Sequence, residues 1–162
     1  MVLNATIDYQ LKKEDAADFL KDKNFAVVVS QFNAEVCDGL LSGALQTLEE
    51  YGVSNQNIKV LRVPGAFELP VVAKKITDSK KYAGIICLGC VVRGETPHFE
   101  FVSLASTMGC LQTSLEGTPI GFGLLTVDNN DQARARSAQD ENNKGRESVL
   151  AVFETLKTLE QI

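Results

Sequence analysis

Hydrophobic residues along the chain occur either in short unbroken runs or at helical spacing. Phe25 to Val29 is an unbroken apolar run, which is typical of a strand covered on both faces. Asn33 then fits a helix N-cap, and the apolar residues that follow it recur every four positions until Gly52. The pattern predicts a buried strand followed by an amphipathic helix that ends near Gly52.

The same alternation of strand and helix continues through the rest of the chain. Further strands are expected at 58–63, 84–88 and 120–127, and further helices over 69–76, after Pro97, near 129–137 and from about 143 to 159. Residues 1–24 are polar and mixed, so we expect an N-terminal arm there, with a short strand near 6–9. Residues 25–162 are expected to form a single domain.

Strands that alternate with helices are joined by right-handed crossovers, which makes the sheet parallel and places helices on both of its faces. We therefore expect an α/β fold with a four-stranded parallel sheet. All four prolines fall at expected strand ends or first helical turns, which supports these boundaries. Ligands bind beyond the carboxyl ends of the strands in such sheets, so the segments to search are 30–33, 64–68, 89–98 and 126–130.

The net charge of the chain limits the classes of partner that it can bind. The net charge is -5 and the sequence pI is about 4.9, which argues against binding to nucleic acid or to an anionic membrane surface. No apolar stretch approaches the length of a bilayer span, and the N-terminus lacks the pattern of a signal peptide, so a cytoplasmic location is expected. A local arginine could still bind a small anionic substrate.

The four cysteines are expected to be reduced, mostly buried thiols. Cys87 and Cys90 could indicate metal or redox chemistry, but a spacing of three along a strand points their side chains to opposite faces. No second cysteine pair or nearby histidine completes a zinc site. The acidic stretch 128–131 lacks the glycine and distal glutamate of a calcium loop and fits a helix cap instead, so no metal site is expected.

Two of the strand-end segments each allow a binding and a structural interpretation. Phe32, just past the first strand, could stack on a flat ring, but taken alone it would more often close the core at the helix start. Glu68 follows a Pro-Gly turn that opens a helix, where it could accept hydrogen bonds from sugar hydroxyls or could simply be a first-turn glutamate that the helix dipole favours. For Glu68 the two interpretations are evenly matched.

The segment 89–99 contains a candidate catalytic residue and a candidate phosphate-binding loop. Thr96 fits an N-cap and Pro97 the first helical position, so His98 should lie in the first turn, where the helix dipole favours the neutral imidazole. A neutral imidazole can exchange protons near pH 7, and the loop N–H groups before it can hold a phosphate. The alternative is an ordinary, partly buried histidine, but this is the only histidine in the chain.

Three basic residues near the C-terminus are weaker candidates. Arg134 and Arg136 could grip a phosphate through two hydrogen bonds, although such arginines are more often solvated helix charges. Lys144 could bond a carbonyl group, but alone it would more often cap a helix.

Taken together, these segments resemble the lumazine synthase family. The matching stretches are Ser-Gln-Phe-Asn at 30–33, Leu-Leu-Ser-Gly-Ala at 40–44, Val-Pro-Gly-Ala-Phe-Glu-Leu-Pro at 63–70, Arg-Gly-Glu-Thr-Pro-His-Phe at 93–99, Gly-Phe-Gly-Leu-Leu-Thr at 121–126, Gln-Ala at 132–133 and Asn-Lys-Gly at 143–145. They span about residues 25 to 158, in the family's order. The resemblance implies a flavodoxin-like three-layer sandwich.

The resemblance also implies a reaction. The family condenses 5-amino-6-(D-ribitylamino)uracil with 3,4-dihydroxy-2-butanone 4-phosphate to give 6,7-dimethyl-8-ribityllumazine, the penultimate step of riboflavin biosynthesis. Schiff-base formation, phosphate elimination and ring closure follow one another, and no metal or organic cofactor is implied. Most of the rate gain then comes from holding both reactants together and from proton transfer.

The expected roles of the site residues come from the matching motifs. Phe32 is expected to stack on the pyrimidine ring, His98 to act as the acid/base catalyst, and Glu95 and Thr96 to offer backbone groups to the phosphate. The other substrate contacts are expected from Ala66, Phe67 and Glu68 on the ribityl chain, backbone groups of Cys90, Val91 and Val92 at the ring edge, Arg136 on the phosphate, Lys144 on a ring carbonyl and Phe122 of a neighbouring subunit.

The chain departs from the usual family pattern at a few positions. Cys90 stands where threonine is more common, Ser137-Ala138 replaces Ala-Gly after Arg136, and Asn142 replaces a glycine. Because these changes fall mainly at the junction of the last two helices, they affect that junction more than the chemistry. The family forms pentamers, some of which stack into shells of sixty subunits, so a pentamer or a shell is expected, with riboflavin synthase as a candidate partner.

Two alternatives involve no catalysis. The chain could store or carry a flavin or lumazine, or it could form a shell with vestigial chemistry. His98, Arg136 and Lys144 argue against both, because a pure binder does not need a proton shuttle. A thiol redox protein built on Cys87 and Cys90 fails on strand geometry.

Overall fold

The computed structural model describes residues 7–162, and its elements follow the expected alternation from the first strand onward. The strands are β1 (Phe25–Ser30), β2 (Ile58–Val63), β3 (Gly84–Val92) and β4 (Ile120–Val127). The helices are α1 (Lys13–Leu20), α2 (Ala34–Glu50), α3 (Leu69–Ser79), α4 (His98–Ser114), α5 (Asn130–Ser137) and α6 (Lys144–Leu159), with short 3₁₀ turns η1 (Asn55–Asn57) and η2 (Ala66–Glu68).

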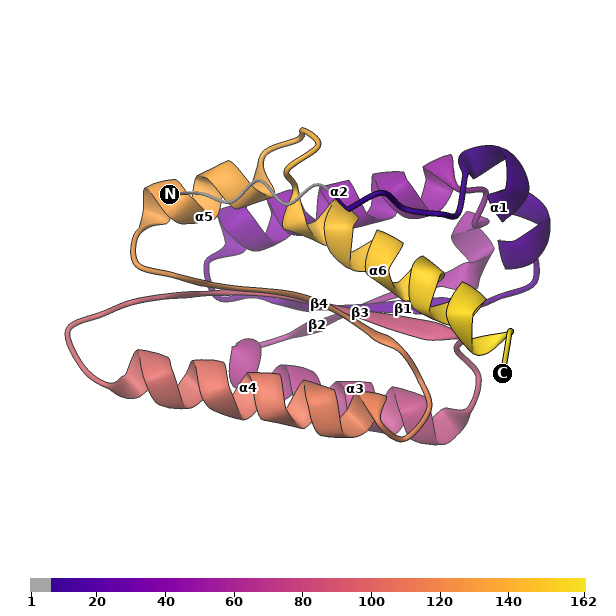
Figure 1. Cartoon of the computed structure of the whole chain (residues 1–162). Coiled ribbons are helices and arrows are strands. Elements are labelled where there is room, and N and C mark those ends of the chain that lie inside the picture. The colour runs from indigo at the N-terminus through magenta and orange to yellow at the C-terminus, as the bar shows by residue number, and fades with distance from the viewer. Residues whose placement is uncertain (1–6) are drawn as a thin grey trace.

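All four strands are parallel and lie in the order β2-β1-β3-β4. Phe25 of β1 lies beside Ile58 on one side and Gly84 on the other, and Ile85 of β3 lies beside Ile120. Figure 1 shows α3 and α4 on one face of the sheet and α2, α5 and α6 on the other. This arrangement confirms the flavodoxin-like sandwich, and its strand order reverses between β1 and β3, where ligands bind in such sheets.

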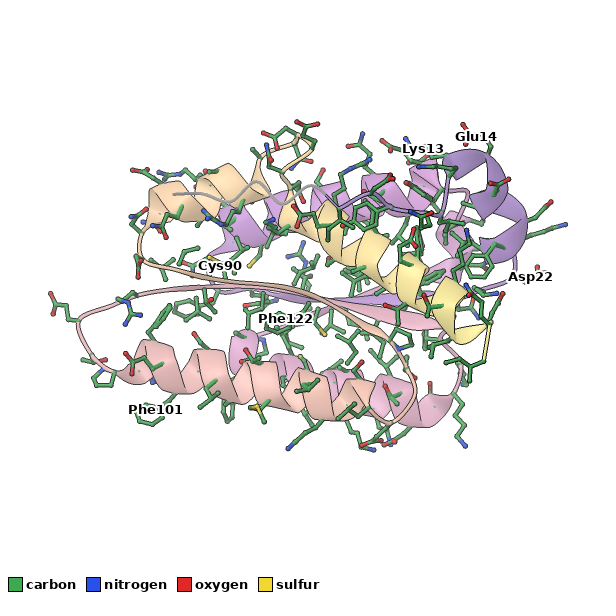
Figure 2. The ribbon with its side chains drawn as sticks, in the orientation of Figure 1. Lys13, Glu14, Asp22, Cys90, Phe101 and Phe122 are labelled. Carbon is green, nitrogen blue, oxygen red and sulfur yellow. The ribbon has the colours of Figure 1, made fainter. Side chains whose placement is uncertain are left out.

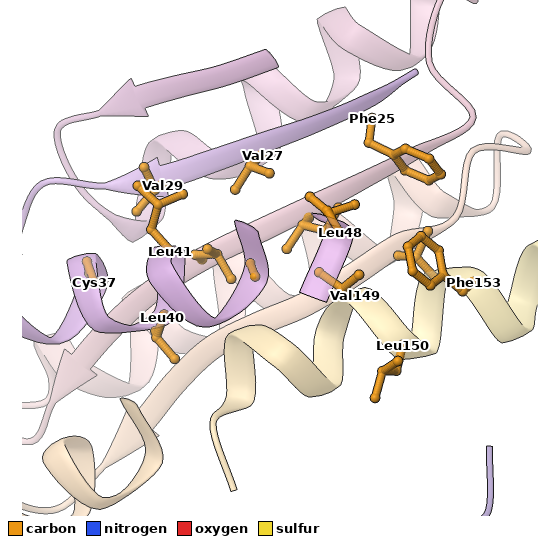
Figure 3. Packing of buried hydrophobic residues seen from close by; sticks show 14 of the residues in the cluster. Phe25, Val27, Val29, Cys37, Leu40, Leu41, Leu48, Val149, Leu150 and Phe153 are labelled. Carbon is orange, nitrogen blue, oxygen red and sulfur yellow. The ribbon is translucent and has the colours of Figure 1, made fainter. Parts of the chain in front are cut away.

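The sheet separates two hydrophobic cores. Phe25, Val27 and Val29 of β1 face α2 and α6 (Figure 3), whereas Ala26 and Val28 face α3 and α4. The whole of β1 is buried, which explains its unbroken apolar sequence. Each fully buried aliphatic or aromatic side chain contributes about 1.5–3 kcal/mol to the stability of the fold. This central strand is therefore firmly held, and it positions the turn at its carboxyl end.

The N-terminal region contains a helix that the sequence pattern did not predict. α1 buries Ala16 and Leu20, and the preceding Leu11 is also buried and donates its backbone N–H to Glu154 of α6 at 2.6 Å. The short strand expected near 6–9 is absent from its described part, residues 7–9, and Thr6 lies outside the described residues. The division of the chain into an arm and a domain stays a prediction.

Three element boundaries differ from the sequence expectation. α3 continues beyond Ile76 to Ser79. β3 continues beyond Leu88 to Val92, because its last residues still pair with β4, as Cys90 does with Leu125. α4 begins at His98, with Pro97 rather than Thr96 at the N-cap. The carbonyl oxygen of Pro97 accepts the first helical hydrogen bonds, which moves the start of the helix one residue along.

No helix within residues 7–162 is both long and apolar enough to cross a membrane.

Candidate active site

A cavity of about 750 Å³ opens at the carboxyl ends of β1 and β3. Its walls are the β1–α2 turn, η2, the end of β3, the loop that follows β3 and the first turns of α4. Three of the four segments that the sequence singled out therefore meet at one place. The expected site residues that line this cavity are Phe32, Ala66, Phe67, Glu68, Cys90, Val91, Val92, Thr96 and His98.

The ring of Phe32 is presented to the cavity and does not close the core. Its side chain is 73% exposed, while its backbone is held on both sides. The N–H of Phe32 donates to the carbonyl oxygen of Pro64 at 3.1 Å, and the thiol of Cys37 donates to the carbonyl oxygen of Phe32 at 3.1 Å. An exposed ring on a fixed backbone is a suitable platform for a flat ligand.

Asn33 is a cavity residue whose role the sequence analysis did not foresee. It occupies the N-cap position of α2, but in a left-handed conformation (φ 56°) and without a side-chain cap bond. Its amide instead donates to the carbonyl oxygen of Cys90 at 2.8 Å, which ties the β1–α2 turn to β3. Asparagine tolerates this backbone conformation better than most residues, which is the one sequence signal that could have indicated the turn. The same bond occupies the carbonyl of Cys90.

Glu68 has a structural role as a cap of its own turn, which is a different role from the expected interaction with the helix dipole. Its Oε2 atom accepts a hydrogen bond from the N–H of Gly65 at 2.9 Å, which closes η2 on itself. The side chain is half-buried and lines the cavity. A carboxylate has further lone pairs, so the capping bond leaves acceptor capacity that faces the cavity.

The loop between β3 and α4 carries unpaired donors. Within residues 7–162, the backbone N–H groups of Gly94, Glu95 and Thr96 have no hydrogen-bond acceptor. His98 follows as the first residue of α4 and is exposed at the wall of the cavity. Free N–H groups beside a helix N-terminus favour an anionic group.

Two aromatic residues of α4 also line the cavity. Phe99 and Phe101 follow His98 in the first turn, and Phe101 is 70% exposed at the outer surface of the helix (Figure 2). Neither residue was among the expected substrate contacts. The helical offset of three between Phe101 and His98 was the signal that places both on one side of α4.

The four cysteines are free and buried, as expected. Cys87 packs in the core beneath α3 and α4, whereas Cys90 packs in the opposite core beneath α2, so the two thiols lie on opposite faces of the sheet. Burial raises the pKa of Cys90 to about 11 and that of Cys37 to about 12. These thiols stay protonated near neutral pH, which excludes them as thiolate nucleophiles. The described residues contain no cluster of three His, Cys, Asp or Glu side chains that could hold a metal ion.

The remaining expected site residues lie elsewhere on the chain. Phe122, Arg136 and Lys144 line a second groove, of about 510 Å³, between the outer strand β4 and α6. The two hollows share no lining residue, and Glu95 lines neither. In the groove, the ammonium of Lys144 lies 2.6 Å from each carboxylate oxygen of Glu147, and Arg136 donates to the carbonyl oxygen of Gln132 at 3.0 Å.

Comparison with known proteins points to one family over most of the chain. The sequence model of a family described as 6,7-dimethyl-8-ribityllumazine synthase matches residues 22–160. The 6,7-dimethyl-8-ribityllumazine synthase of Nitratidesulfovibrio vulgaris (strain DP4) is 48% identical over 143 residues, 88% of this chain and 92% of the relative. The 6,7-dimethyl-8-ribityllumazine synthase 1 of Caulobacter vibrioides is 48% identical over 138 residues, 85% of this chain and 90% of the relative. The enzyme of the same name from Syntrophus aciditrophicus is 46% identical over 143 residues.

Proposed function

The chain belongs to the 6,7-dimethyl-8-ribityllumazine synthase family, and from that premise we propose how its two hollows carry out the family's reaction. The enzyme is a transferase of riboflavin biosynthesis. It condenses 5-amino-6-(D-ribitylamino)uracil with 3,4-dihydroxy-2-butanone 4-phosphate to give 6,7-dimethyl-8-ribityllumazine, releasing phosphate and water. The observation that carries the proposal is the meeting of a ring platform, a sugar-binding turn and an anion-binding loop in one cavity.

The pyrimidine substrate occupies the inner part of the cavity. Its flat ring stacks on Phe32, and backbone groups at the end of β3 meet the ring edge. These groups belong to Cys90, Val91 and Val92, and the carbonyl of Cys90 is held in place by its hydrogen bond from Asn33. The ribityl chain runs along η2, where the remaining acceptor capacity of Glu68 binds hydroxyl groups.

The butanone phosphate occupies the outer part of the cavity, beside the loop that precedes α4. The free N–H groups of Glu95 and Thr96 hold its phosphate, aided by the positive end of the helix. The imidazole of His98, at the wall of the same cavity, transfers protons during Schiff-base formation and phosphate elimination. Holding both reactants in one cavity supplies much of the acceleration, because their translational and rotational freedom is already lost before the barrier is reached.

Phe122, Arg136 and Lys144 contribute to the cavity of a neighbouring subunit. The family acts on small molecules and assembles into oligomers, and on this chain the three residues line a groove separate from the cavity. A ring of subunits places the groove of one against the cavity of the next. There, Phe122 walls the site, Arg136 pairs with the phosphate, and Lys144 reaches a ring carbonyl.

An exposed apolar stripe on α4 supports assembly into a closed ring. The stripe has the 3-4-3-4 spacing of a coiled-coil seam, and its side chains are between 43% and 78% exposed in the single chain. Its members are Phe101, Leu104, Met108, Leu111 and Leu115. We propose a pentamer as the basic unit, with the sixty-subunit shell and an association with riboflavin synthase as further possibilities for a protein that acts in the cytoplasm.

A rate assay tests the activity directly. Purified protein is mixed with both substrates, and the absorbance of the lumazine is followed beside the spontaneous reaction and a heat-denatured control. The proposal expects lumazine to form well above the spontaneous rate. Tight binding of the pyrimidine without any acceleration would instead favour a flavin or lumazine carrier.

A further inference from the structure

Arg93, the first residue after β3, makes an unusual set of contacts for an exposed arginine. Its Nε donates to Oδ1 of Asp128 at 3.0 Å, and its Nη1 donates to Oε1 of Glu100 at 3.3 Å. The central Cζ atom of the same guanidinium lies over the ring of Phe99, 4.3 Å from its centroid. The backbone N–H of Arg93 also donates to the carbonyl oxygen of Val127 at 2.8 Å. One side chain therefore binds three different partners.

Arg93 and two of its partners lie at opposite ends of the loop formed by residues 94–98. Arg93 precedes the loop, whereas Phe99 and Glu100 lie just after it in the first turn of α4. The guanidinium thus connects the two ends of the loop. Asp128 connects it in turn to the segment between β4 and α5, which lies at the same edge of the sheet (Figure 1). α5 is also the helix that carries Arg136.

Little else holds this loop in shape. Residues 94–98 are all exposed, and a Cβ added at Gly94 would meet no atom within 4 Å. Within residues 7–162, the side chains of Glu95, Thr96 and His98 make no hydrogen bond. The shape of a loop with free N–H groups and no packing depends mainly on the contacts that hold its two ends together. Here those contacts are the ones that the side chain of Arg93 makes.

We propose that Arg93 is a positioning residue for the phosphate half of the active site. Its guanidinium fixes the curvature of loop 94–98, so that the free N–H groups and the imidazole of His98 converge on one substrate. The inference rests on the proposed function. Arginine suits this task because its planar fork can bind two carboxylates while its face stacks on an aromatic ring, which lysine cannot do.

The alternative role for Arg93, as a direct phosphate ligand, fits the geometry less well. Arg93 is not among the residues that line the cavity. Its donors are directed to two carboxylates, and those carboxylates would repel a phosphate beside them. The two roles predict opposite effects when the carboxylates are neutralised, which makes them separable.

The test compares steady-state kinetics for both substrates in four variants. Arg93→Ala is expected to raise KM for the phosphate substrate and to lower kcat. Together these changes should reduce kcat/KM by roughly 10- to 100-fold, since small displacements of reacting groups have effects of this size. KM for the pyrimidine should stay close to the wild-type value. Arg93→Lys should recover only part of the loss. The double variant Asp128→Asn, Glu100→Gln should shift in the same direction as Arg93→Ala.

Arg62→Ala is the matched control. Arg62 forms one exposed ion pair, with Asp38 at 2.8 Å, and its side chain is 43% exposed, against 46% for Arg93. It does not line the cavity. This variant should keep both KM values.

Three results would overturn the inference: a normal KM for phosphate substrate in Arg93→Ala, an equal loss of pyrimidine binding, or tighter phosphate binding after the carboxylates are neutralised. Titration with inorganic phosphate gives an independent readout. If the wild-type protein binds phosphate but makes no lumazine, the proposed function fails, while weaker phosphate binding by Arg93→Ala and by the double variant would still support the positioning role. Unchanged phosphate binding would reject it.

Discussion

The imidazole of His98 stands at the wall of the cavity as the first residue of α4, directly after the loop that offers free N–H groups. A proton shuttle at this position can serve both the new imine and the leaving phosphate. The contacts proposed for the pyrimidine come from other elements that line the cavity, namely the β1–α2 turn, η2 and β3. Proton transfer and ring binding are therefore separable by mutation.

His98→Ala should lower kcat by roughly 10²-fold, the low end for loss of an acid/base group, because proximity of the two reactants remains. The affinity for the pyrimidine should be nearly unchanged, since the ring platform is not altered. Stopped-flow turnover and equilibrium titration of the pyrimidine measure the two quantities. An unchanged kcat would remove His98 from the mechanism.

The sequence predicted most residues of the cavity but not how each is held. For Phe32 the local pattern alone favoured a ring that closes the core, because it does not record the hydrogen bonds that the backbone of Phe32 makes with Pro64 and Cys37. The tie between Asn33 and Cys90 joins positions 57 residues apart, and no local pattern records it. Such long-range hydrogen bonds follow only from the folded arrangement.

At the scale of elements, Asn143 fixes the junction between α5 and α6. It is almost fully buried, and its Oδ1 caps α6 by accepting from the N–H groups of Gly145 and Arg146. Its Nδ2 donates to the carbonyl oxygens of Gly39, Ser137 and Ala138. The departures from the family pattern at 137–138 and 142 surround this single side chain.

Asn143→Ala should lower the free energy of unfolding by about 2–4 kcal/mol, because it removes the cap of α6 and all three hydrogen bonds that Nδ2 donates, and leaves the carbonyl oxygen of Ala138 without its side-chain donor. The comparison is Asn129→Ala, which removes the exposed cap of α5 and one bond to Gln132, and should cost about 1 kcal/mol. Chemical unfolding at fixed protein concentration measures both. Equal effects would contradict the role of the buried junction.

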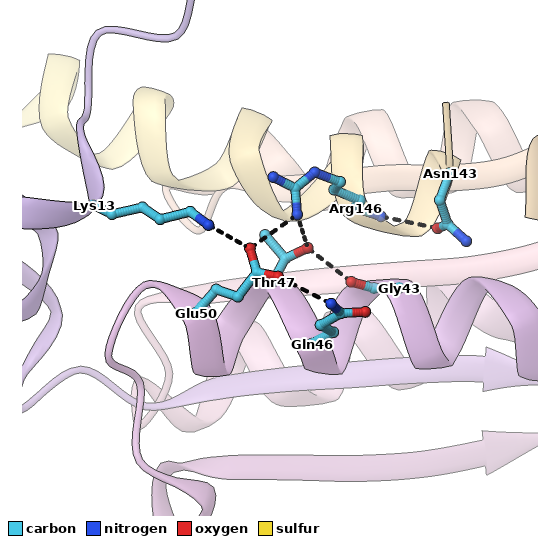
Figure 4. Close-up of polar contacts among 7 residues, drawn as sticks. All are labelled: Lys13, Gly43, Gln46, Thr47, Glu50, Asn143 and Arg146. Carbon is cyan, nitrogen blue, oxygen red and sulfur yellow. Dashed lines mark hydrogen bonds and ion pairs between the residues drawn. The ribbon is translucent and has the colours of Figure 1, made fainter. Parts of the chain in front are cut away.

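One carboxylate links α1 to two other helices (Figure 4). Glu50 of α2 accepts from Lys13 of α1 at 2.7 Å and from Arg146 of α6 at 3.2 Å. The hydrogen bond from Lys13 is the main cause that lowers the pKa of Glu50 below its ordinary value of 4.5. The contribution of this contact is present above the ordinary pKa and is lost as the pH falls through the lowered one.

The attachment of α1 should therefore weaken in acid, at pH values below about 4.5. Hydrogen exchange of the peptide 11–23, corrected for its intrinsic rate, should rise there before that of the sheet. In Glu50→Gln the exchange of this peptide should already be faster at neutral pH, with less additional change in acid. A pH response that is identical in both proteins would assign it to another group.

The same contacts explain why α1 was missed while the strands were predicted. The strands are buried on both faces or pair along their whole length, so their composition records their environment. α1 buries only Ala16 and Leu20, and it depends on partners in α2 and α6 that lie far away in the sequence. A short polar helix of this kind has no periodic signal strong enough to detect.

At the scale of the whole molecule, residues 7–162 leave two features without a partner in the single chain: the stripe on α4 and the groove along β4. Leu104, near the start of the stripe, is 61% exposed. Leu104→Glu should shift the protein to smaller species in sedimentation velocity, because a charge in an apolar seam is not solvated. Leu159→Glu, at the exposed end of α6, should not. Unchanged assembly of the first variant would place the interface elsewhere.

Mixed assemblies test the shared active site most directly. One inactive parent carries Phe32→Ala and His98→Ala in the cavity, and the other carries Arg136→Ala in the groove. After the two parents are unfolded and refolded together in equal amounts, about one quarter of the interfaces should join an intact cavity to an intact groove, as expected for a head-to-tail ring. Lumazine formation should then rise to about that fraction of the wild-type rate. Activity no higher than the sum of the separately refolded parents would contradict a site built from two subunits.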